Sequence, residues 1–233
     1  MLTLLGLGFL LGLRHAFEAD HAAAVVALAS RSHSVGETVR QGIAWGIGHA
    51  LTLFLFCSVM LSLNSIVPER VALALEMAVG VMLIGLGLDV WRRIRRDRIH
   101  IHIHEHGAGK SHIHVHAHRN ETDRAHAVHQ HVHQVPYRAL LVGMTHGMAG
   151  SAALILLTLH ATTSIALSLT YIILFGLGSI LGMATLSLAI AIPIHRSAQS
   201  FAWACDGIQI VIGGISVFLG ASMLYTQGSE FLG

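Results

Sequence analysis

The sequence predicts an all-α, polytopic membrane protein whose six transmembrane helices form two inverted three-helix repeats. Hydrophobic side chains make up 54% of the 233 residues and charged ones only 11%, whereas a soluble domain carries about one-half and about one-quarter. A helix needs about 20 apolar residues to cross a hydrocarbon core of about 30 Å. Six stretches reach that length, near residues 2–30, 41–64, 71–91, 138–159, 165–192 and 205–226.

The first stretch, MLTLLGLGFLLGL, could be taken for a signal peptide. It has no basic segment at its start and no small-residue cleavage site before charged residues appear, so we expect it to remain as the first span. Cys57 and Cys205 both fall inside expected spans, and they therefore do not indicate a secreted disulfide framework.

The Lys and Arg residues predict the orientation of these spans, because cytoplasmic loops retain positive charge. Of the 14, all but two lie in or beside the first, third and fifth loops: Arg31, Arg40, Arg92, Arg93, Arg95, Arg96, Arg98, Lys110, Arg119, Arg124, Arg138 and Arg196. We therefore expect an inner-membrane protein with these loops in the cytoplasm and both termini outside. The net charge of +2 follows from this orientation and gives no reason to expect a nucleic-acid partner.

A short pattern recurs in the first and fourth spans, as Gly12-Leu-Arg-His15 and Gly143-Met-Thr-His146. With three helices in each half, the two halves would insert in opposite orientations, as in secondary transporters that place substrate sites at the repeat interface. The alternative is a chance match in Gly-rich apolar sequence. The expected divisions are a first repeat, a polar loop and a second repeat, over residues 1–91, 92–137 and 138–233.

The first span holds ionisable side chains far from either end: Arg14, His15, Glu18, Asp20 and His21. Charges at that depth cost from a few to more than about 10 kcal/mol, so they face a bundle interior or an aqueous cavity and mark an ion path. On a straight helix His15 and Asp20 would lie about 140° apart around the axis and about 7.5 Å apart along it. We therefore expect a break in this helix, for which Gly12 gives one place, or ligands from other spans.

Histidines of other spans lie at a similar depth. His21, His49 and His146 are each eight or nine residues from the cytoplasmic end of their spans, or about 12 to 14 Å at 1.5 Å per residue. With Asp20 and His15 they could surround one ion, since several imidazoles and a carboxylate suit Ni²⁺, Co²⁺, Zn²⁺ or Cu²⁺, whereas Mg²⁺ and Ca²⁺ prefer oxygen ligands. Alternatively, His49 and His146 make interhelical hydrogen bonds.

Other polar side chains of the spans are expected to support this site. Arg14 and Glu18 are one helical turn apart and can neutralise each other as an i,i+4 pair. Thr52 and Ser151 are expected to supply hydroxyls beside the ligands or in helix packing.

The loop between the third and fourth spans is rich in histidine. Residues 100–133 include His100, His102, His104, His106, His112, His114, His116, His118, His126, His129, His131 and His133. Such tracts bind metal by composition. We expect weak, exchangeable binding of transition-metal ions by a segment without fixed geometry.

The pattern His15-Ala-Phe-Glu-Ala-Asp20-His21 resembles the HxxxxDH signature of the nickel/cobalt transporter family, and Gly48-His49-x-x-Thr52 resembles that family's next motif. The resemblance implies a Ni²⁺/Co²⁺ permease fold in which His15, Asp20, His21 and His49 line the metal path.

Within that family, the short six-span form and the stretch from Gly143 to Ser151 are similar to compact members related to urease accessory permeases. Two departures bear on selectivity and coupling. Glu18 stands where the family motif has Asp, and the second half of the chain has no match to the family's later acidic motif.

The expected function is transport of Ni²⁺ or Co²⁺ across the cytoplasmic membrane. Uptake is slightly favoured, because the membrane potential assists inward movement by about 2.3 kcal/mol per charge per 100 mV. No P-loop occurs, so energy coupling would need an ion gradient, the membrane potential or another subunit. We expect no enzymatic activity and no cofactor. The metal ion is the substrate, and the lipid bilayer and nickel metallochaperones are the expected partners.

Two alternatives remain open on the sequence. A permease for Zn²⁺ or another metal would need paired ligands in the fourth and fifth spans, and the fifth has no His, Asp or Glu. A membrane-bound storage protein or metallochaperone for urease or hydrogenase maturation would bind metal without moving it across the bilayer.

Overall fold

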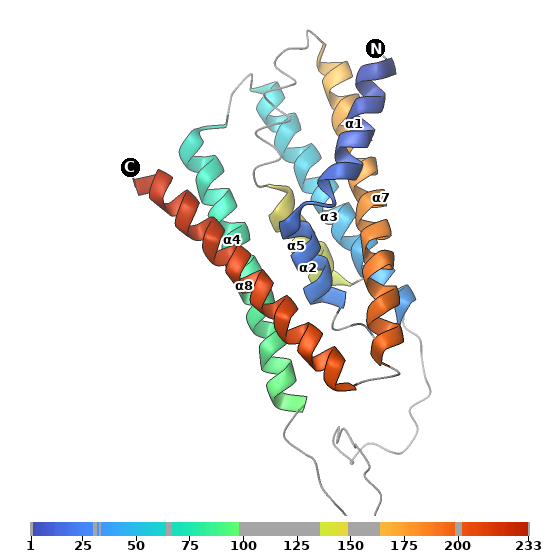
Figure 1. Cartoon of the computed structure of the whole chain (residues 1–233). Coiled ribbons are helices and arrows are strands. Elements are labelled where there is room, and N and C mark those ends of the chain that lie inside the picture. Colours follow the sequence, from blue (N-terminus) through green and yellow to red (C-terminus); the bar gives the residue numbers. More distant parts are fainter. Residues whose placement is uncertain are drawn as a thin grey trace, which may run out of the picture.

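The protein is helical throughout the part that the computed structural model describes, residues 2–29, 32, 34–63, 67–97, 136–148, 164–198 and 202–232. The helices of these ranges are α1 (Leu2–His15), α2 (Ala19–Ala29), α3 (Val35–Ser62), α4 (Glu69–Asp97), α5 (Tyr137–Gly147), α7 (Ile165–Ala198) and α8 (Ala202–Leu232). In Figure 1 the long helices run roughly alongside one another, with the short α2 and α5 among them. The predicted all-α class is confirmed.

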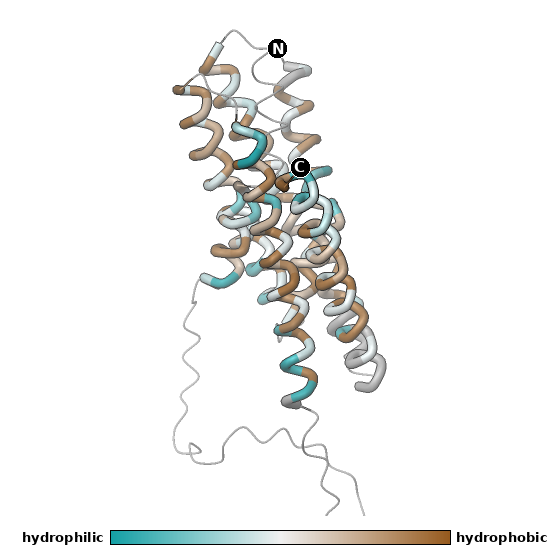
Figure 2. The backbone as a smooth tube through the Cα atoms, turned by 90° about the vertical axis from the view of Figure 1, so that its left-hand side faces the viewer, coloured by the Kyte–Doolittle hydropathy of each residue, from teal (hydrophilic) through white to brown (hydrophobic). Residues whose placement is uncertain are grey.

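Four of the described helices are long and apolar enough to cross a membrane: Val35–Ser62, Glu69–Arg95, Ile165–Pro193 and Gln209–Leu232. Their outward faces expose large apolar side chains, such as Leu55 on α3 and Phe218 on α8. Along most of their length the helices are hydrophobic, and the lower end of α4 is hydrophilic (Figure 2). Helices with an apolar exterior satisfy a lipid environment, and the fold is that of a membrane protein.

The first expected span is interrupted, because α1 ends at His15 and α2 begins at Ala19. In the turn between them, the Phe17 amide donates to the Arg14 carbonyl at 2.9 Å, and the Glu18 amide donates to the His15 carbonyl at 3.1 Å. The expected break therefore exists, but it lies at residues 16–18 and not at Gly12. Inside α1, Gly12 is where that helix touches α7, and its carbonyl accepts the Ser179 hydroxyl at 3.2 Å.

Close glycine contacts hold the helix pairs together. A Cβ on Gly12 of α1 would collide with the backbone of Phe175, and one on Gly178 of α7 would collide with the backbone of Phe9. Small residues let helix backbones approach in this way where the bilayer supplies no hydrophobic drive for association. The α3·α5 and α4·α8 pairs use the same device, for example at Gly143 against the Trp45 carbonyl.

The pairs are assembled around α2. Helix α3 packs against both α5 and α7, α1 packs against α7, and α4 packs against α8. The short, Ala-rich α2 contacts α3, α4, α7 and α8, and Figure 1 shows it between the α4·α8 pair and the other helices. Its residues Ala24, Val25 and Leu28 join Trp45 and Leu83 in the largest buried apolar cluster. The start of α2 is therefore held in the interior of the bundle.

Candidate metal centre

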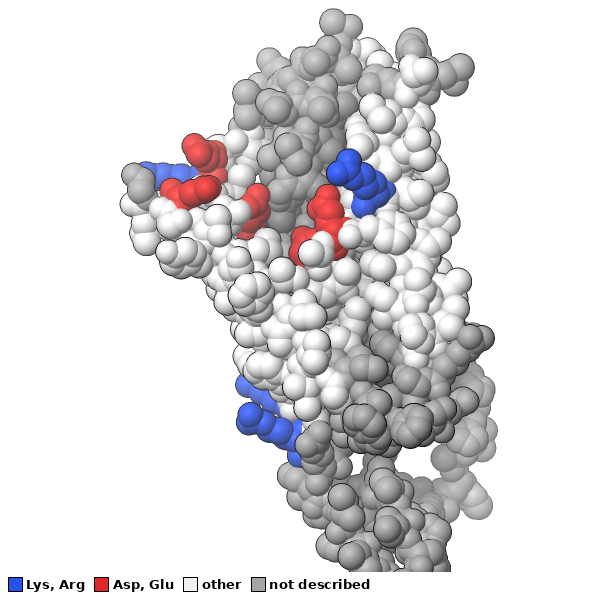
Figure 3. Space-filling view, viewed as in Figure 1, with Lys and Arg blue, Asp and Glu red and all other residues white. Residues whose placement is uncertain are grey.

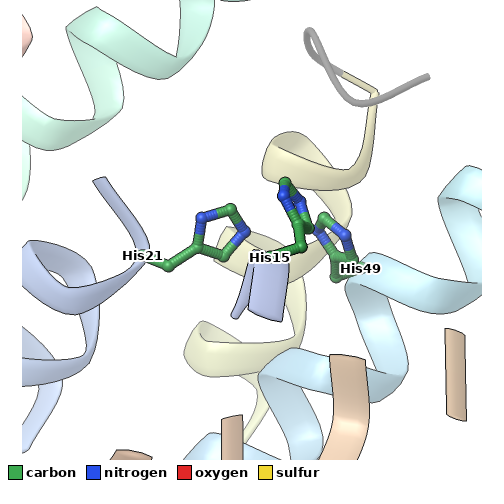
Figure 4. A group of neighbouring side chains, drawn as sticks. All are labelled: His15, His21 and His49. Atoms are coloured by element: carbon green, nitrogen blue, oxygen red, sulfur yellow. The ribbon is translucent and has the colours of Figure 1, made fainter. Parts of the chain in front are cut away.

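Four imidazoles from four helices meet inside the bundle. They belong to the last residue of α1 (His15) and to residues of α2 (His21), α3 (His49) and α5 (His146), and all four are buried. The ring of His21 lies 4.0 Å from that of His146, 4.4 Å from that of His15 and 5.4 Å from that of His49, between centroids. Figure 4 shows the rings of His15, His21 and His49 gathered in one place from separate segments.

This cluster lies near the middle of the long helix α3. In α3, which runs over 28 residues, His49 is about 20 Å from either end at 1.5 Å per residue. The interruption of the first span brings both of its histidines to that depth. Because the chain turns at residues 16–18, His15 and His21 are no longer separated by helical geometry, and their rings meet edge to face.

Asp20 links two of the histidines. Its Oδ1 lies 2.9 Å from Nδ1 of His21 and accepts the His21 amide at 2.8 Å, while its Oδ2 lies 2.8 Å from Nε2 of His146. An ionised carboxylate only accepts hydrogen bonds, so both ring nitrogens donate to it. Asp20 is also in the first turn of α2, where the helix dipole stabilises a negative charge.

Glu18 holds His15 in a similar way, with its Oε2 3.1 Å from Nδ1 of His15. Helical spacing predicted Arg14 as the partner of Glu18, but within the described residues no ion pair joins the two side chains. The reason is the end of α1 at His15, after which the i,i+4 relation no longer applies. Each of the two histidines of the first span therefore has a carboxylate on Nδ1, an arrangement that orients metal-binding imidazoles in proteins.

The remaining ring nitrogens of the cluster have no protein partner. Among the described residues, these buried atoms are Nε2 of His15, Nε2 of His21, both ring nitrogens of His49 and Nδ1 of His146. A buried polar atom left unpaired costs about 1–3 kcal/mol. A structural core therefore rarely contains this many unpaired nitrogens in one place. Two groups have ligand atoms within 4.8 Å of one another: His15, His21 and His49, and also Asp20, His21 and His146.

Comparison with known proteins agrees with this chemistry. The NicO family, described as High-affinity nickel-transport protein, matches residues 1–223. The chain belongs to the NicO family. It is also 33% identical over 229 residues to the urease accessory protein UreH of Bacillus sp. (strain TB-90), covering 98% of this chain and 93% of UreH. No solved structure gives a significant match.

Membership in NicO confirms the family predicted from the sequence and the function expected from it, transport of Ni²⁺ or Co²⁺ across the membrane. For a NicO protein the metal ion is cargo rather than a resident cofactor.

Two aromatic side chains that sequence analysis missed form walls of the cluster. Trp45 is fully buried, and its ring stacks on His21 at 5.5 Å and lies 5.8 Å from His146, between centroids. Phe175 of α7 lies 5.5 Å from His15. Spacing carried a signal for Trp45, since it precedes His49 by one helical turn and therefore shares its face of α3. Nothing in the sequence around Phe175 indicated its place.

Trp45 also lines a narrow pocket that has no room for a water molecule. The pocket is formed by α2, α3 and α7, and its lining includes Thr38, Gln41 and Ser187. Inside the described part of the protein, Oε1 of Gln41, Nε1 of Trp45 and Oγ of Ser187 are buried without a hydrogen-bond partner. Unpaired polar atoms thus also lie around Trp45 and Gln41, nearer the start of α3 than His49 is.

The other expected site residues contribute less or lie elsewhere. The Thr52 hydroxyl donates to the Gly48 carbonyl of its own helix at 3.0 Å. Arg14 is exposed at the end of α1. Ser151 and the loop histidines from His100 to His133 lie outside the described residues.

Proposed function

We propose that this NicO protein carries Ni²⁺ or Co²⁺ through the buried cluster of His15, Asp20, His21, His49 and His146, in the direction of uptake. The observation that carries the proposal is the convergence of unpartnered imidazole nitrogens at mid-depth in an apolar bundle. Ionisable groups inside a membrane protein normally serve an ion pathway.

The donor atoms favour borderline transition metals. Imidazole nitrogens bind Ni²⁺, Co²⁺, Cu²⁺ and Zn²⁺, whereas Mg²⁺ and Ca²⁺ are held by oxygen. The carboxylates of Glu18 and Asp20 would fix the orientation of two ligands, a function that typically contributes 10- to 100-fold in affinity. Arg14, Thr52 and Ser151 would act around this site and not as ligands.

The proposed topology has six crossings. Helices α1 and α2 together would make the first crossing, and α5 with the residues that follow it would make the fourth. Inverted repeats are supported by the contacts between helices. If α1 is equivalent to α5, α3 to α7 and α4 to α8, then the α1·α7 contact in one half corresponds to the α3·α5 contact in the other. The α3·α7 and α4·α8 contacts each join two equivalent helices. The exchanged helices run in opposite directions (Figure 1).

The orientation proposed from the sequence is also supported. Helix α1 starts and α8 ends at the upper end of the bundle in Figure 1, while α4 ends and α5 begins at the lower end. In Figure 3, basic side chains lie at the lower left of the face, and others lie in its upper half beside the acidic ones. Arg92, Arg93 and Arg95 belong to the lower end of α4. By the positive-inside rule, the lower end would be cytoplasmic in the inner membrane. The His-rich loop would collect arriving metal there for nickel metallochaperones.

The driving force for uptake would be the membrane potential, worth about 4.6 kcal/mol for a divalent cation at 100 mV. Such passage makes and breaks only metal–ligand bonds, so the protein would act without enzymatic chemistry.

The test is ⁶³Ni²⁺ flux into oriented proteoliposomes, with Co²⁺, Zn²⁺ and Mn²⁺ as competitors. Asp20→Asn should reduce the initial rate about 10- to 100-fold, because an amide oxygen and amide nitrogen cannot both accept from the two histidines. Glu230→Gln is the matched control, since it neutralises an exposed carboxylate at the far end of α8, and its rate should equal that of the unaltered chain. Metal binding without flux under any gradient would overturn the proposal in favour of storage.

A further inference from the structure

We propose that the histidine cluster consists of two overlapping cation subsites that share His21 and are filled one at a time. The first is formed by His15, His21 and His49, and the second by Asp20, His21 and His146. This inference rests on the proposed function, because it assigns successive positions to the same transported ion. The assignment of the two subsites follows from which ring nitrogens lack a hydrogen-bond partner and which already donate to a carboxylate.

The first subsite offers three nitrogens. Nδ1 of His15 is held by Glu18 and Nδ1 of His21 by Asp20, which leaves Nε2 of each ring as the free atom. His49 adds one of its two unpartnered nitrogens. Ligands about 2.1 Å from one tetrahedral ion lie about 3.4 Å apart. One nitrogen of each ring lies within 4.8 Å of one nitrogen of each of the other two, so small side-chain movements bring three nitrogens to that spacing.

The second subsite offers two nitrogens and an oxygen. Asp20 already contacts Nδ1 of His21 at 2.9 Å and Nε2 of His146 at 2.8 Å. These contacts are hydrogen bonds, and an ion bound there would replace the two bridging protons. His146 is the sole ligand from the second half of the chain among the described residues of the cluster. The second subsite therefore joins the two halves.

The two subsites exclude each other because of His21. A neutral imidazole carries a proton on one nitrogen and a lone pair on the other. When Nε2 binds the ion in the first subsite, Nδ1 keeps its proton and donates to Asp20. When Nδ1 binds the ion in the second, its proton has left to water and Nε2 has taken one up from water, so the proton count of His21 is unchanged. In the same step Nε2 of His146 gives its proton to water and Nδ1 of His146 takes one up. Repulsion between two divalent ions at this separation acts in the same direction.

Sequential occupancy suits a transport site, which must bind an ion well enough to select it and weakly enough to release it. The all-nitrogen subsite favours borderline metals over Mg²⁺ and Ca²⁺. The second subsite trades a nitrogen for a carboxylate oxygen and requires that Asp20 give up its hydrogen bonds. It is therefore the weaker of the two, and the ion leaves from it.

The experiment is a Co²⁺ titration of the full-length chain in detergent, followed by d–d absorption and calorimetry, with the twelve loop histidines replaced by asparagine. We compare His15→Ala and His146→Gln, in which the amide can still donate to Asp20. Thr145→Ala is the matched control, because its hydroxyl bonds only the Leu141 carbonyl of its own helix. Flux is measured for the same variants in proteoliposomes.

The expected results separate the subsites. The unaltered cluster binds one Co²⁺ per chain, His146→Gln keeps this spectrum and affinity but loses at least about 10-fold in flux, and His15→Ala loses affinity by about 10- to 100-fold with a changed spectrum. Two Co²⁺ ions bound together in the cluster, or His146→Gln with unchanged flux, would overturn the inference. If the unaltered chain binds one ion with these spectra but passes none, the proposed function fails and the second subsite falls with it, while the first subsite remains as a binding site.

Discussion

The α4·α8 pair and the group formed by α1, α2, α3, α5 and α7 use the same packing device for different purposes. Both bring backbones together at glycines. Yet the most apolar stretches of α4 and α8 are only 28% and 17% buried, against 39% and 44% for α3 and α7. Of the buried polar side chains in the described residues, Ser216 alone belongs to α4 or α8. One region thus encloses polar chemistry, and the other supports it from the lipid side.

The link between the two regions is α2. At its start, Asp20 and His21 face the cluster, while further along the Ala23 carbonyl accepts the Ser216 hydroxyl of α8 at 3.4 Å. If this division of roles is correct, changes in the first region alter ion movement, and changes in the α4·α8 pair alter stability. The following experiments sharpen or break that contrast.

The largest effect is expected for His21→Ala, because His21 belongs to both candidate groups of ligands. Flux should fall by about 100-fold or more, since removing a ligand costs at least as much as the 10- to 100-fold loss seen when only its orienting partner is removed. Ser216→Ala is the comparison from the supporting region, and it should keep the flux of the unaltered chain. Equal effects of both changes on ⁶³Ni²⁺ flux would remove the distinction between the regions.

Gly147→Ala should act on the site without touching a ligand. A Cβ at Gly147 would collide with the His49 carbonyl, so α5 must move away from α3 and carry His146 with it. Overpacking of this kind costs about 1–3 kcal/mol, and the initial rate should fall along with thermal stability. Gly85→Ala is the control, because nothing lies within 4 Å of its Cβ position. It should leave flux intact and gain slightly in helix propensity.

Gly220→Ala should lower thermal stability without changing the transport properties of the folded protein. Its Cβ would collide with the Gly80 carbonyl across the α4·α8 pair, again at about 1–3 kcal/mol. The folded fraction should still transport with an unchanged KM and metal preference, because no ligand moves. Thermal unfolding in detergent measures the loss of stability. Flux per folded molecule measures KM and metal preference. A change of metal preference in this variant would show that α4 and α8 shape the site directly.

Removal of residues 100–133 is expected to have the smallest effect on flux. The five cluster residues identified among the described residues lie outside that segment, so initial rates should be retained while the number of metal ions bound per chain decreases. Parallel measurement of ⁶³Ni²⁺ flux and of equilibrium binding checks both parts. A complete loss of flux would instead make the loop part of the pathway and favour a storage or delivery function.

The sequence predicted which residues meet at the site better than how they meet. Depth along each span was enough to group His21, His49 and His146, because a helix rises by a fixed amount per residue. The position of the break was not predictable in the same way. Gly12 offered the flexible backbone, but it lies inside α1 and against Phe175, and the chain turns after His15.

The roles of the carboxylates also required the fold. Spacing on an intact helix paired Glu18 with Arg14, whereas the turn gives it to His15. In the same way, sequence adjacency offered Asp20 as a ligand beside His21. The structure shows both of its oxygens already accepting from histidines on two helices, which no local pattern encodes. Trp45 was overlooked because a tryptophan in an apolar span usually has no special meaning.

The most direct test of the account is nickel K-edge X-ray absorption by the full-length chain, with its loop histidines replaced by asparagine and one equivalent of Ni²⁺ bound. We predict multiple scattering from about three imidazoles at bonding distance, and one imidazole fewer in His49→Ala. A shell of oxygen ligands without imidazole scattering, or a spectrum that His49→Ala leaves unchanged, would contradict the claim that the ion passes through the buried histidine cluster.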